Sequence, residues 1–429
     1  MTGRPFRLGA CGVLATVAVT LAGVLTACSS SHSGSLRFVW WGNDDRAKAT
    51  QQAVALFEKA NPKIKVQVEF SAYPAYVQKL TTEIAGGASP DLIQVDRPTF
   101  GEYQHKHVLV DLSKYVGKSL HLDKMPPELV AGGKADGGQY AAPAGQTTQM
   151  VAYDADKFAK AGVTVPTEGW TWQEFTTDME KVGAATGAAG TTDFGWAVDW
   201  FDSWLHTRGK QLYTSDGQLG FTADDLTAFW TMTGEMRDKK GVSAPQATTK
   251  MDGSMQNSAL VTSAAASEFN YDSNLTGYVS SYTSGKVQAA PLPSDSPGAA
   301  QSGMAALPPV YFAVSKQSKH KGDAVKLMDF LINDPAAGKV LGATRGLPAN
   351  LDVRAQVCGS ADPGNKAVCD YETAVKSKVG PSSSWLWPSG SSAIKTDFQK
   401  VYDDVIFGKK SPAAAAAQVV SDAQQSLKS

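Results

Sequence analysis

Two groups of side chains that could hold a polar ligand follow segments whose apolar pattern predicts buried strands. Aromatic rings can stack on the apolar C–H faces of a sugar, while charged and amide groups can hydrogen-bond to its hydroxyls. Ligands of α/β sheets bind beyond the carboxyl ends of the strands, where both groups fall. The alternative for each polar residue is a helix cap or a surface ion pair. The first group is Trp41, Asn43, Asp44 and Arg46, and the second is Asp96 and Arg97.

Motifs of known catalytic chemistry are missing from the sequence. It contains no P-loop, no G-x-G-x-x-G after the first strand and no G-x-S-x-G turn. The histidines at 105, 107 and 121 fit no common zinc spacing, so a solvated loop is the better interpretation. Acidic pairs at 44–45 and 224–225 stand at predicted helix starts. A glycosidase carboxylate pair assembled in space stays open as an alternative. We expect no cofactor and no metal.

Cys28 closes an uncharged apolar run that begins just after Arg4 and Arg7. A basic start, an apolar stretch and small residues before a cleavage point are typical of a secretory signal. Residues 25–28, Leu-Thr-Ala-Cys, resemble the lipobox of bacterial lipoproteins. In that family the cysteine thiol receives a diacylglyceryl group, and cleavage makes the cysteine the new N-terminus.

The resemblance implies a signal peptide over residues 1–27 and lipidation of Cys28. Two acyl chains would hold the mature protein to the outer face of the cell membrane. Residues 28–35 are rich in serine and suit a flexible tether. An uncleaved membrane helix over residues 8–27 and plain secretion are the alternatives, although that run is near the lower limit for spanning.

The remaining cysteines bear on redox chemistry. Cys11 lies in the signal, which leaves Cys358 and Cys369 close together in the part of the chain expected outside the cytoplasm. Oxidising surroundings favour a disulfide between them. A metal site is the weaker interpretation, because no histidine or further cysteine lies at ligand spacing.

Size and composition indicate a soluble globular protein with more than one core. About 400 residues remain without the signal, which exceeds the usual ceiling for a single hydrophobic core. The formal net charge is −1, and no polybasic block is present, so nucleic acid is not an expected partner. Ten tryptophans and thirteen tyrosines are distinctive, because aromatics at this density often line binding surfaces.

Strand-like and helix-like segments alternate at the start of the mature chain. This alternation predicts a parallel α/β sheet. Further along, the pattern becomes mainly helical, with an aromatic-dense segment at 194–204. Strands are expected at 36–41, 64–70, 91–96, 287–291 and 310–314, and helices at 44–60, 76–85, 171–189, 224–239, 323–333, 394–405 and 413–427.

Segments in this order resemble family 1 of the bacterial extracellular solute-binding proteins, the sugar receptors of ABC importers. The resemblance covers nearly the whole mature chain, and it rests on the order and spacing of pieces that are weak alone. The pieces are Phe-Val-Trp-Trp-Gly at 38–42 and the segments at 57–62, 64–66, 76–80, 86–93, 138–143, 153–154, 158–162, 166, 171–175 and 346–349.

The resemblance implies a periplasmic-binding-protein-like fold: two discontinuous α/β lobes joined by a hinge, with a ligand cleft between them. Closure of the lobes around ligand would be a hinge motion. The first lobe would hold residues 36–143 and 301–347, and the second residues 148–298 and 350–429.

Further ligand residues follow from the resemblance. Asp96 and Arg97 are similar to an Asp-Arg pair of maltose-type receptors. Asn270 and Tyr271 occupy the place of a stacking aromatic, although the preceding stretch at 258–267 departs from the family pattern. The other candidates are Trp200, Trp204, Arg345, Trp385 and Trp387, and core packing is the alternative for each tryptophan.

The sequence therefore predicts a membrane-anchored monomer that binds a mono- or oligosaccharide, delivers it to the permease of an ABC importer and has no catalytic activity. A secreted carbohydrate-active enzyme and a receptor for a non-sugar solute are the alternatives. If Arg46, Arg97 and Arg345 all face the cleft, the ligand could be an acidic sugar.

Overall fold

The computed structural model describes residues 35–428, apart from residues 167–168, 296–302 and 381–385. The signal peptide expected at 1–27, Cys28 and nearly all of the tether lie outside the described residues, as does Trp385. Within the described part of the chain, no helix is both long and apolar enough to span a bilayer.

A five-stranded mixed sheet has the strand order β2-β1-β3-β11-β6. Strand β1 runs parallel to both β2 and β3, which confirms the parallel pairing expected for the first three strands. The later strand β11 is antiparallel to β3 and to β6, so the sheet as a whole is mixed. The strands are β1 (Leu36–Trp41), β2 (Val66–Ser71), β3 (Leu92–Val95), β6 (Ala141–Pro143) and β11 (Tyr311–Val314).

Helices cover both faces of this sheet. Successive side chains of β1 point to opposite sides, so each face presents apolar residues that helices can bury. Phe38 and Trp40 belong to one hydrophobic cluster and Val39 to another. Phe57 joins the first cluster and Tyr76 the second. The helices of this region are α1 (Asp44–Ala60), α2 (Tyr73–Ala85), α3 (Arg97–His105), α4 (Pro127–Ala131), α11 (Lys321–Asn333), α12 (Pro335–Leu341) and α13 (Leu351–Cys358).

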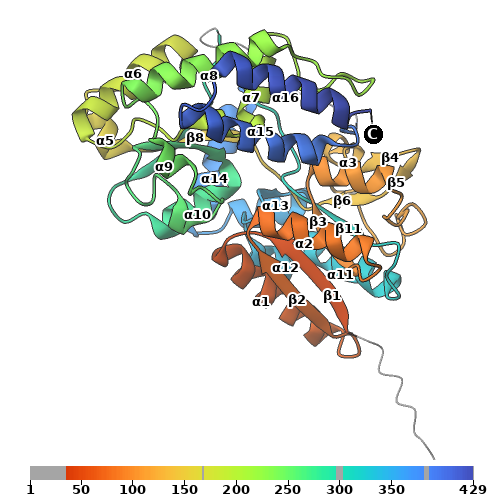
Figure 1. Ribbon diagram of the computed structural model, residues 1–429. Coiled ribbons are helices and arrows are strands. Elements are labelled where there is room, and N and C mark those ends of the chain that lie inside the picture. Colours follow the sequence, from red (N-terminus) through yellow and green to blue (C-terminus); the bar gives the residue numbers. More distant parts are fainter. Residues whose placement is uncertain (1–34, 167–168, 296–302, 381–385, 429) are drawn as a thin grey trace, which may run out of the picture. The chain divides into compact units, whose positions relative to one another are not determined.

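A second sheet has three antiparallel strands in the order β10-β8-β9. Its central strand, β8, is labelled in Figure 1. Its strands are β8 (Gln149–Asp154), β9 (Ser267–Tyr271) and β10 (Val287–Ala290). The helices α5 (Ala155–Lys160), α6 (Trp172–Thr186), α7 (Val198–His206), α8 (Ala223–Asp238), α9 (Pro245–Thr248), α10 (Leu275–Ser281), α14 (Pro363–Val375), α15 (Ser391–Ile406) and α16 (Pro412–Ser426) belong to this part.

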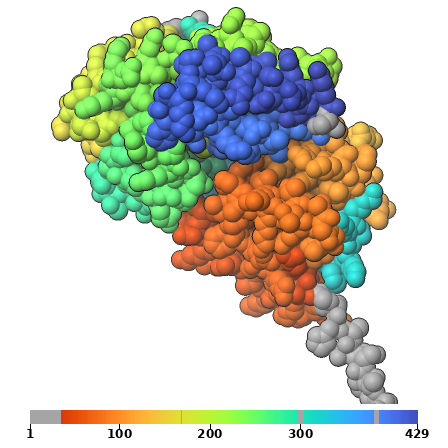
Figure 2. Space-filling model, in the orientation of Figure 1, coloured from red at the N-terminus to blue at the C-terminus, as the bar shows by residue number. Residues whose placement is uncertain are grey.

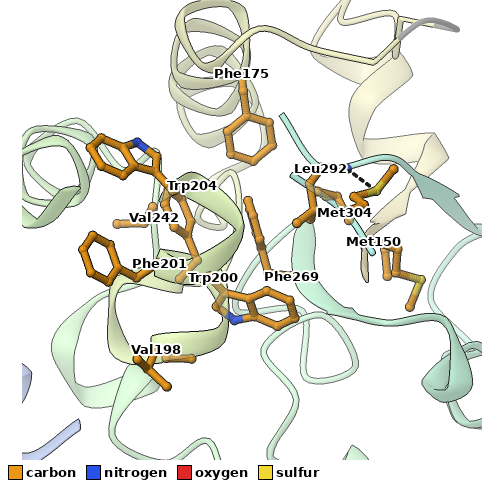
Figure 3. Packing of buried hydrophobic residues seen from close by; sticks show 14 of the residues in the cluster. Met150, Phe175, Val198, Trp200, Phe201, Trp204, Val242, Phe269, Leu292 and Met304 are labelled. Atoms are coloured by element: carbon orange, nitrogen blue, oxygen red, sulfur yellow. Dashed lines mark hydrogen bonds between the residues drawn. The ribbon is translucent and has the colours of Figure 1, made fainter. Parts of the chain in front are cut away.

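Aromatic rings dominate the largest hydrophobic cluster, which packs on the second sheet (Figure 3). Phe269 of β9 lies with its ring centroid 4.5 Å from that of Phe194 and 5.8 Å from that of Trp200. Phe201 and Trp204 of α7 stack on each other with centroids 6.0 Å apart. The aromatic-dense segment noted in the sequence is thus mainly core.

Short elements complete the chain. Strand β7 pairs with β12, and an isolated bridge joins Thr147 to Leu307. On the face shown in Figure 2, the blue surface of the C-terminal helices borders the orange surface that includes α3, in agreement with contacts between α15 and α3. The short elements are β4 (Lys134–Ala135), β5 (Gly138–Gln139), β7 (Gly145–Gln146), β12 (Leu347–Pro348), η1 (Phe194–Trp196), η2 (Met255–Asn257), η3 (Asp272–Asn274) and η4 (Lys376–Lys378).

The helix starts show why acidic pairs stand where they do. Asp44 and Asp45 occupy the first turn of α1, as expected. In α8, Asp225 forms a capping box with Thr222, each side chain satisfying the other's backbone N–H. Helix α6 ends at Thr186, earlier than expected, because Gly187 adopts a φ of 79° that most residues avoid.

The predicted disulfide is present between Cys358 at the end of α13 and Cys369 in α14, with Cα atoms 5.7 Å apart. The α/β fold class is confirmed. The lobe boundaries and the hinge stay a prediction.

A pair of buried carboxyl groups lies beside the segment that links β7 to β8. The hydroxyl of Thr147 donates to Asp272, and the hydroxyl of Thr148 donates to Glu372 over 2.8 Å. Burial, together with the nearby Glu372, raises the pKa of Asp272 well above its usual range. The buried surroundings therefore disfavour the ionised form of Asp272.

Candidate functional site

A cavity of about 720 Å³ lies at the carboxyl ends of β1 and β3 and at the end of β9. Its size is in the range of small-molecule binding sites, which span roughly 300 to 1,000 Å³. One part of the lining follows the five-stranded sheet and includes Trp41, Tyr73 and Asp96. The other part comes from η1, α7, β9 and α15 and includes Asp199, Tyr271 and Lys395.

Aromatic rings form much of the cavity wall. The ring of Trp41 meets that of Tyr73 edge-on, with centroids 5.4 Å apart. Trp200 lies 5.2 Å from Tyr271 by ring centroids. The guanidinium of Arg97 lies 5.0 Å over the ring of Trp387. Such surfaces suit the apolar faces of a ring-shaped ligand.

Lys395 of α15 joins polar groups from both parts of the lining. Its ammonium nitrogen lies 3.3 Å from Asp199 Oδ2 and 3.9 Å from Asp96 Oδ2. It also lies 4.9 Å over the ring of Tyr73. Burial lowers the pKa of Lys395, but the attraction of Asp199 and Asp96 outweighs it, so the pKa is raised overall. Lys395 is therefore cationic at neutral pH.

Asp96 is held by its own helix and by Tyr73. Its Oδ1 accepts the backbone N–H of Thr99 over 3.0 Å and the hydroxyl of Thr99 over 2.6 Å, in a capping box that begins α3. Its Oδ2 accepts the hydroxyl of Tyr73 over 2.6 Å. Burial and the nearby Asp96 raise the pKa of Tyr73 well above its usual value. The phenol of Tyr73 thus remains a donor at neutral pH.

Similar bonds fix the opposite wall. The hydroxyl of Tyr271 donates to Asp199 Oδ1 over 3.2 Å, and burial raises the pKa of Tyr271 well above its usual value. Asn270 donates its amide N–H to the hydroxyl of Tyr278 over 2.7 Å. Glu268 accepts the hydroxyl of Ser258 over 2.6 Å. Its pKa is raised by burial.

Arg46 brings a buried cation to the cavity. Only 7% of the residue is exposed. Its Nε donates to the carbonyl of Thr344 over 2.8 Å and its Nη1 to the carbonyl of Trp41 over 3.1 Å. Burial lowers the pKa of Arg46 to about 10, so the group is still cationic at neutral pH.

The structure brings eight of the residues chosen from the sequence to this cavity. Four of the others do not line it: Asn43, Asp44, Trp204 and Arg345. Trp385 lies outside the described residues. The eight that line the cavity are Trp41, Arg46, Asp96, Arg97, Trp200, Asn270, Tyr271 and Trp387. Their contact with a ligand stays a prediction.

The four residues away from the lining have other contacts. Asn43 caps α1 by accepting the backbone N–H of Arg46, and Asp44 accepts the side-chain amide of Gln256. Trp204 packs in the core of the second sheet (Figure 3). Arg345 is buried and donates from Nε to the side-chain oxygen of Gln94 over 2.9 Å. Capping and core packing are the alternatives that the sequence left open for such positions.

Sequence reasoning missed several lining residues. Tyr73 comes from the start of α2, which begins before the predicted residue 76. Asp199 and Trp196 lie in the aromatic-dense segment, from which only Trp200 and Trp204 were chosen. Lys395 follows the buried Ile394 near the start of the amphipathic helix α15. A lysine next to a buried apolar residue was the signal in the sequence that could have marked it as a lining residue.

The described residues offer no metal site, since none of their His, Cys, Asp and Glu side chains gather in groups of three or more that could hold an ion. What the cavity can do is bind: its rings offer stacking surfaces, and its charged groups offer hydrogen bonds.

The fold and the cavity together define a solute-binding protein, and comparison with protein families agrees. The model of the family "bacterial extracellular solute-binding protein" matches residues 42–338. That stretch is more than half of the chain, and the protein belongs to this family.

Solved structures with the same fold cover nearly the whole chain. A family 1 extracellular solute-binding protein of Alicyclobacillus acidocaldarius is 29% identical, covers 92% of this chain and 99% of its own, and superposes with a TM-score of 0.65. The substrate-binding protein Lmo0181 of Listeria monocytogenes is 23% identical, with a TM-score of 0.76 over 91% of this chain and 99% of its own. An oligogalacturonide-binding protein of Yersinia enterocolitica is 21% identical, with a TM-score of 0.79 over 92% and 98%.

A curated relative matches a shorter part. An uncharacterized lipoprotein of Streptomyces antibioticus is 28% identical over 173 residues, which are 39% of this chain and 38% of that protein. The match thus spans well under half the length of this relative.

Proposed function

We propose that this solute-binding protein is the receptor of an ABC importer, captures a mono- or oligosaccharide in the cavity and delivers it to the permease. The observation that carries the proposal is the pairing of aromatic walls with fixed hydrogen-bonding groups around a cavity of about 720 Å³. We further propose that the lipidated Cys28 keeps the receptor at the outer face of the membrane, so that bound sugar stays beside the permease.

The cavity chemistry supports a sugar. A pyranose ring has apolar faces and a polar edge, so it needs flat surfaces together with donors and acceptors. Trp41 and Tyr73 supply rings from one part of the lining, and Trp200 and Tyr271 from the other. Lys395 supplies a cationic donor between them.

Two structural neighbours are consistent with this ligand class. The Listeria protein was solved with cycloalternan and the Yersinia protein with saturated digalacturonic acid. At their identities these neighbours show the fold alone, so the sugar rests on the cavity itself. The lipoprotein relative from Streptomyces antibioticus supports the membrane anchor.

Titration calorimetry with a panel of neutral and acidic saccharides tests the receptor function. At least one should bind more tightly than millimolar, which corresponds to about −4 kcal/mol. Replacing Trp387 or Tyr271 with alanine should weaken that binding by roughly 1 to 3 kcal/mol through lost stacking. Phe407→Ala is the matched control, because Phe407 is 46% exposed and does not line the cavity. A panel without binding, or unchanged affinity in both site variants, would contradict the proposal.

The anchor has its own test. Cys28→Ser should abolish labelling of the protein by radioactive palmitate and should leave the signal at residues 1–27 uncleaved. Cys11→Ser is the matched control and should leave both unchanged. Labelling that persists in Cys28→Ser would refute lipidation at this position.

A further inference from the structure

Arg46 is a buried cation of the cavity lining that lacks a protein counter-ion. No ion pair joins it to a carboxylate in the described part of the chain. Its side chain has five N–H groups, and the hydrogen bonds to Thr344 and Trp41 engage two of them. A guanidinium held in this way has donors left for a ligand, while its burial leaves the charge uncompensated.

A second buried arginine, Arg345, lies near Arg46. The Nη1 and Nη2 of Arg345 have no hydrogen-bond partner among the described residues. Burial, and then repulsion from Arg46, lowers the pKa of Arg345 well below its usual value. Gln94 links the two arginines: its Oε1 accepts Arg345 Nε over 2.9 Å, and its Nε2 donates to the carbonyl of Trp41 over 3.1 Å. Arg345 therefore adds no carboxylate or other counter-charge beside Arg46.

The carboxylates of the cavity, in contrast, are occupied by protein donors. Asp96 accepts from Thr99 and Tyr73, and Asp199 accepts from Tyr271 and pairs with Lys395. The remaining lining carboxylates are engaged in the same way. Asp202 accepts the backbone N–H of Leu212, Asp252 accepts from Ser254 and Asn257, and Glu268 accepts from Ser258 and Leu260.

The backbone around Arg46 is built to keep its side chain in place. A Cβ on Gly42 would lie 2.5 Å from Arg46 Cδ, so only glycine leaves room for the stem. The side chain of Asn43 accepts the backbone N–H of Arg46 over 2.9 Å, and the hydroxyl of Thr50 donates to its carbonyl over 2.7 Å. The position is fixed before any ligand arrives.

We propose that Arg46 binds the carboxylate of an acidic sugar, so that the receptor selects uronate-containing saccharides over neutral ones. This inference rests on the proposed sugar-binding function and names the ligand class of the same cavity. The planar guanidinium matches a carboxylate geometrically, and a carboxylate there compensates the buried positive charge. A neutral sugar offers only hydroxyl acceptors and leaves that charge unbalanced.

The test compares matched ligands by titration calorimetry with the intact protein. Digalacturonic acid and galacturonic acid are paired with the neutral α-1,4-galactobiose and galactose, and diglucuronic acid is paired with cellobiose. We expect an acidic member to bind at least tenfold more tightly than its neutral partner. Binding of the neutral members at equal or higher affinity overturns the inference and leaves the sugar-receptor function standing. If no saccharide of either kind binds, the proposed function itself fails.

Variants test whether Arg46 is the residue that causes the preference for acidic over neutral sugars. Arg46→Gln should lower the affinity for the acidic sugar at least tenfold and change the affinity for the neutral partner less than threefold. Gly42→Ala should act in the same direction, because the methyl group displaces the side chain of Arg46. Arg37→Gln is the matched control, since Arg37 pairs with Glu69 and Glu83 and does not line the cavity. An equal loss for both ligands in Arg46→Gln, or an unchanged ratio, overturns the inference. The wild-type comparison decides it even if a variant fails to fold.

Discussion

Replacing Arg237 with methionine should destabilise the protein more than any comparable change at the surface. Arg237 of α8 forms two hydrogen bonds to Asp193 Oδ2, from Nε over 3.1 Å and from Nη2 over 2.6 Å. The side chain of Asp193 is fully buried, and that of Arg237 is 15% exposed. Methionine keeps most of the side-chain volume but removes the charge and the donors.

The size of the effect follows from what remains around Asp193. Removing one partner of a buried ion pair costs about 3 to 5 kcal/mol, because the other charge is left uncompensated. Asp193 Oδ1 still accepts the backbone N–H of Gly195 over 3.1 Å and the hydroxyl of Tyr402 over 2.7 Å. Since these two bonds persist, we expect the lower end, about 3 kcal/mol.

The pH dependence has a definite sign. Burial raises the pKa of Asp193, opposed by Arg237 and by hydrogen bonds from Tyr402 and Gly195. A raised folded-state pKa gives stability that is fully present below the unfolded pKa of about 3.9 and is lost as pH rises through the folded value. Removing Arg237 raises this pKa further. The decrease in the free energy of unfolding caused by Arg237→Met should therefore be largest near pH 7. It should become smaller as the pH falls toward about 4.

Urea unfolding, followed by tryptophan fluorescence at pH 7 and pH 5, measures the effect. Lys239→Met is the matched control, because Lys239 is 62% exposed where it meets Glu180. That control should cost less than about 1 kcal/mol. The reasoning would be refuted if Arg237→Met lowered the free energy of unfolding no more than Lys239→Met does. It would also be refuted if the decrease in Arg237→Met were as large at pH 5 as at pH 7.

Three further outcomes can be measured in the same way. Replacing both Cys358 and Cys369 with serine should lower the free energy of unfolding by at most about 3 kcal/mol, and no loss would show that the bond does not constrain the unfolded chain. Lys395→Met should cost roughly 1 to 3 kcal/mol, evenly from pH 6 to 9 because its pKa is raised, while the exposed Lys400→Met should cost almost nothing. The raised pKa of Asp272 gives stability that is lost as pH rises above the unfolded pKa of about 3.9, so Asp272→Asn should flatten the stability profile above that pH; parallel profiles would contradict this.

The fold could be predicted where one physical signal dominated. The strand at 36–41 is a compact apolar run, and α11 shows an apolar side at helical spacing, so both were placed within a few residues. Helix α7 was not identified as a helix because Trp200, Phe201 and Trp204 are all buried, and a helix buried on most sides has no clear period. The direction of β11 depends on how the chain returns to the sheet, which local patterns do not encode.

The residues of the candidate site could be predicted from the sequence where they directly follow a strand of the parallel part of the sheet. Trp41 and Asp96 follow parallel strands, whose carboxyl ends lie at one edge of the sheet, so the rule for α/β sheets selected them. The choice between Trp200 and Trp204 on α7 could not be made in this way. Both are 5% exposed, and only the first reaches the cavity. Lys395 was out of reach because its meeting with Asp96 depends on the contact of α15 with α3.

Several charged and polar groups order the walls of the cavity, and Arg46 in addition keeps side-chain donors for a ligand. Lys395 and Tyr73 hold Asp96, and Tyr271 holds Asp199, so these bonds exist before a ligand binds. Pre-ordered groups lower the conformational cost of binding. Arg46 has no carboxylate partner among the described residues, and we therefore expect this side chain to favour an anionic ligand.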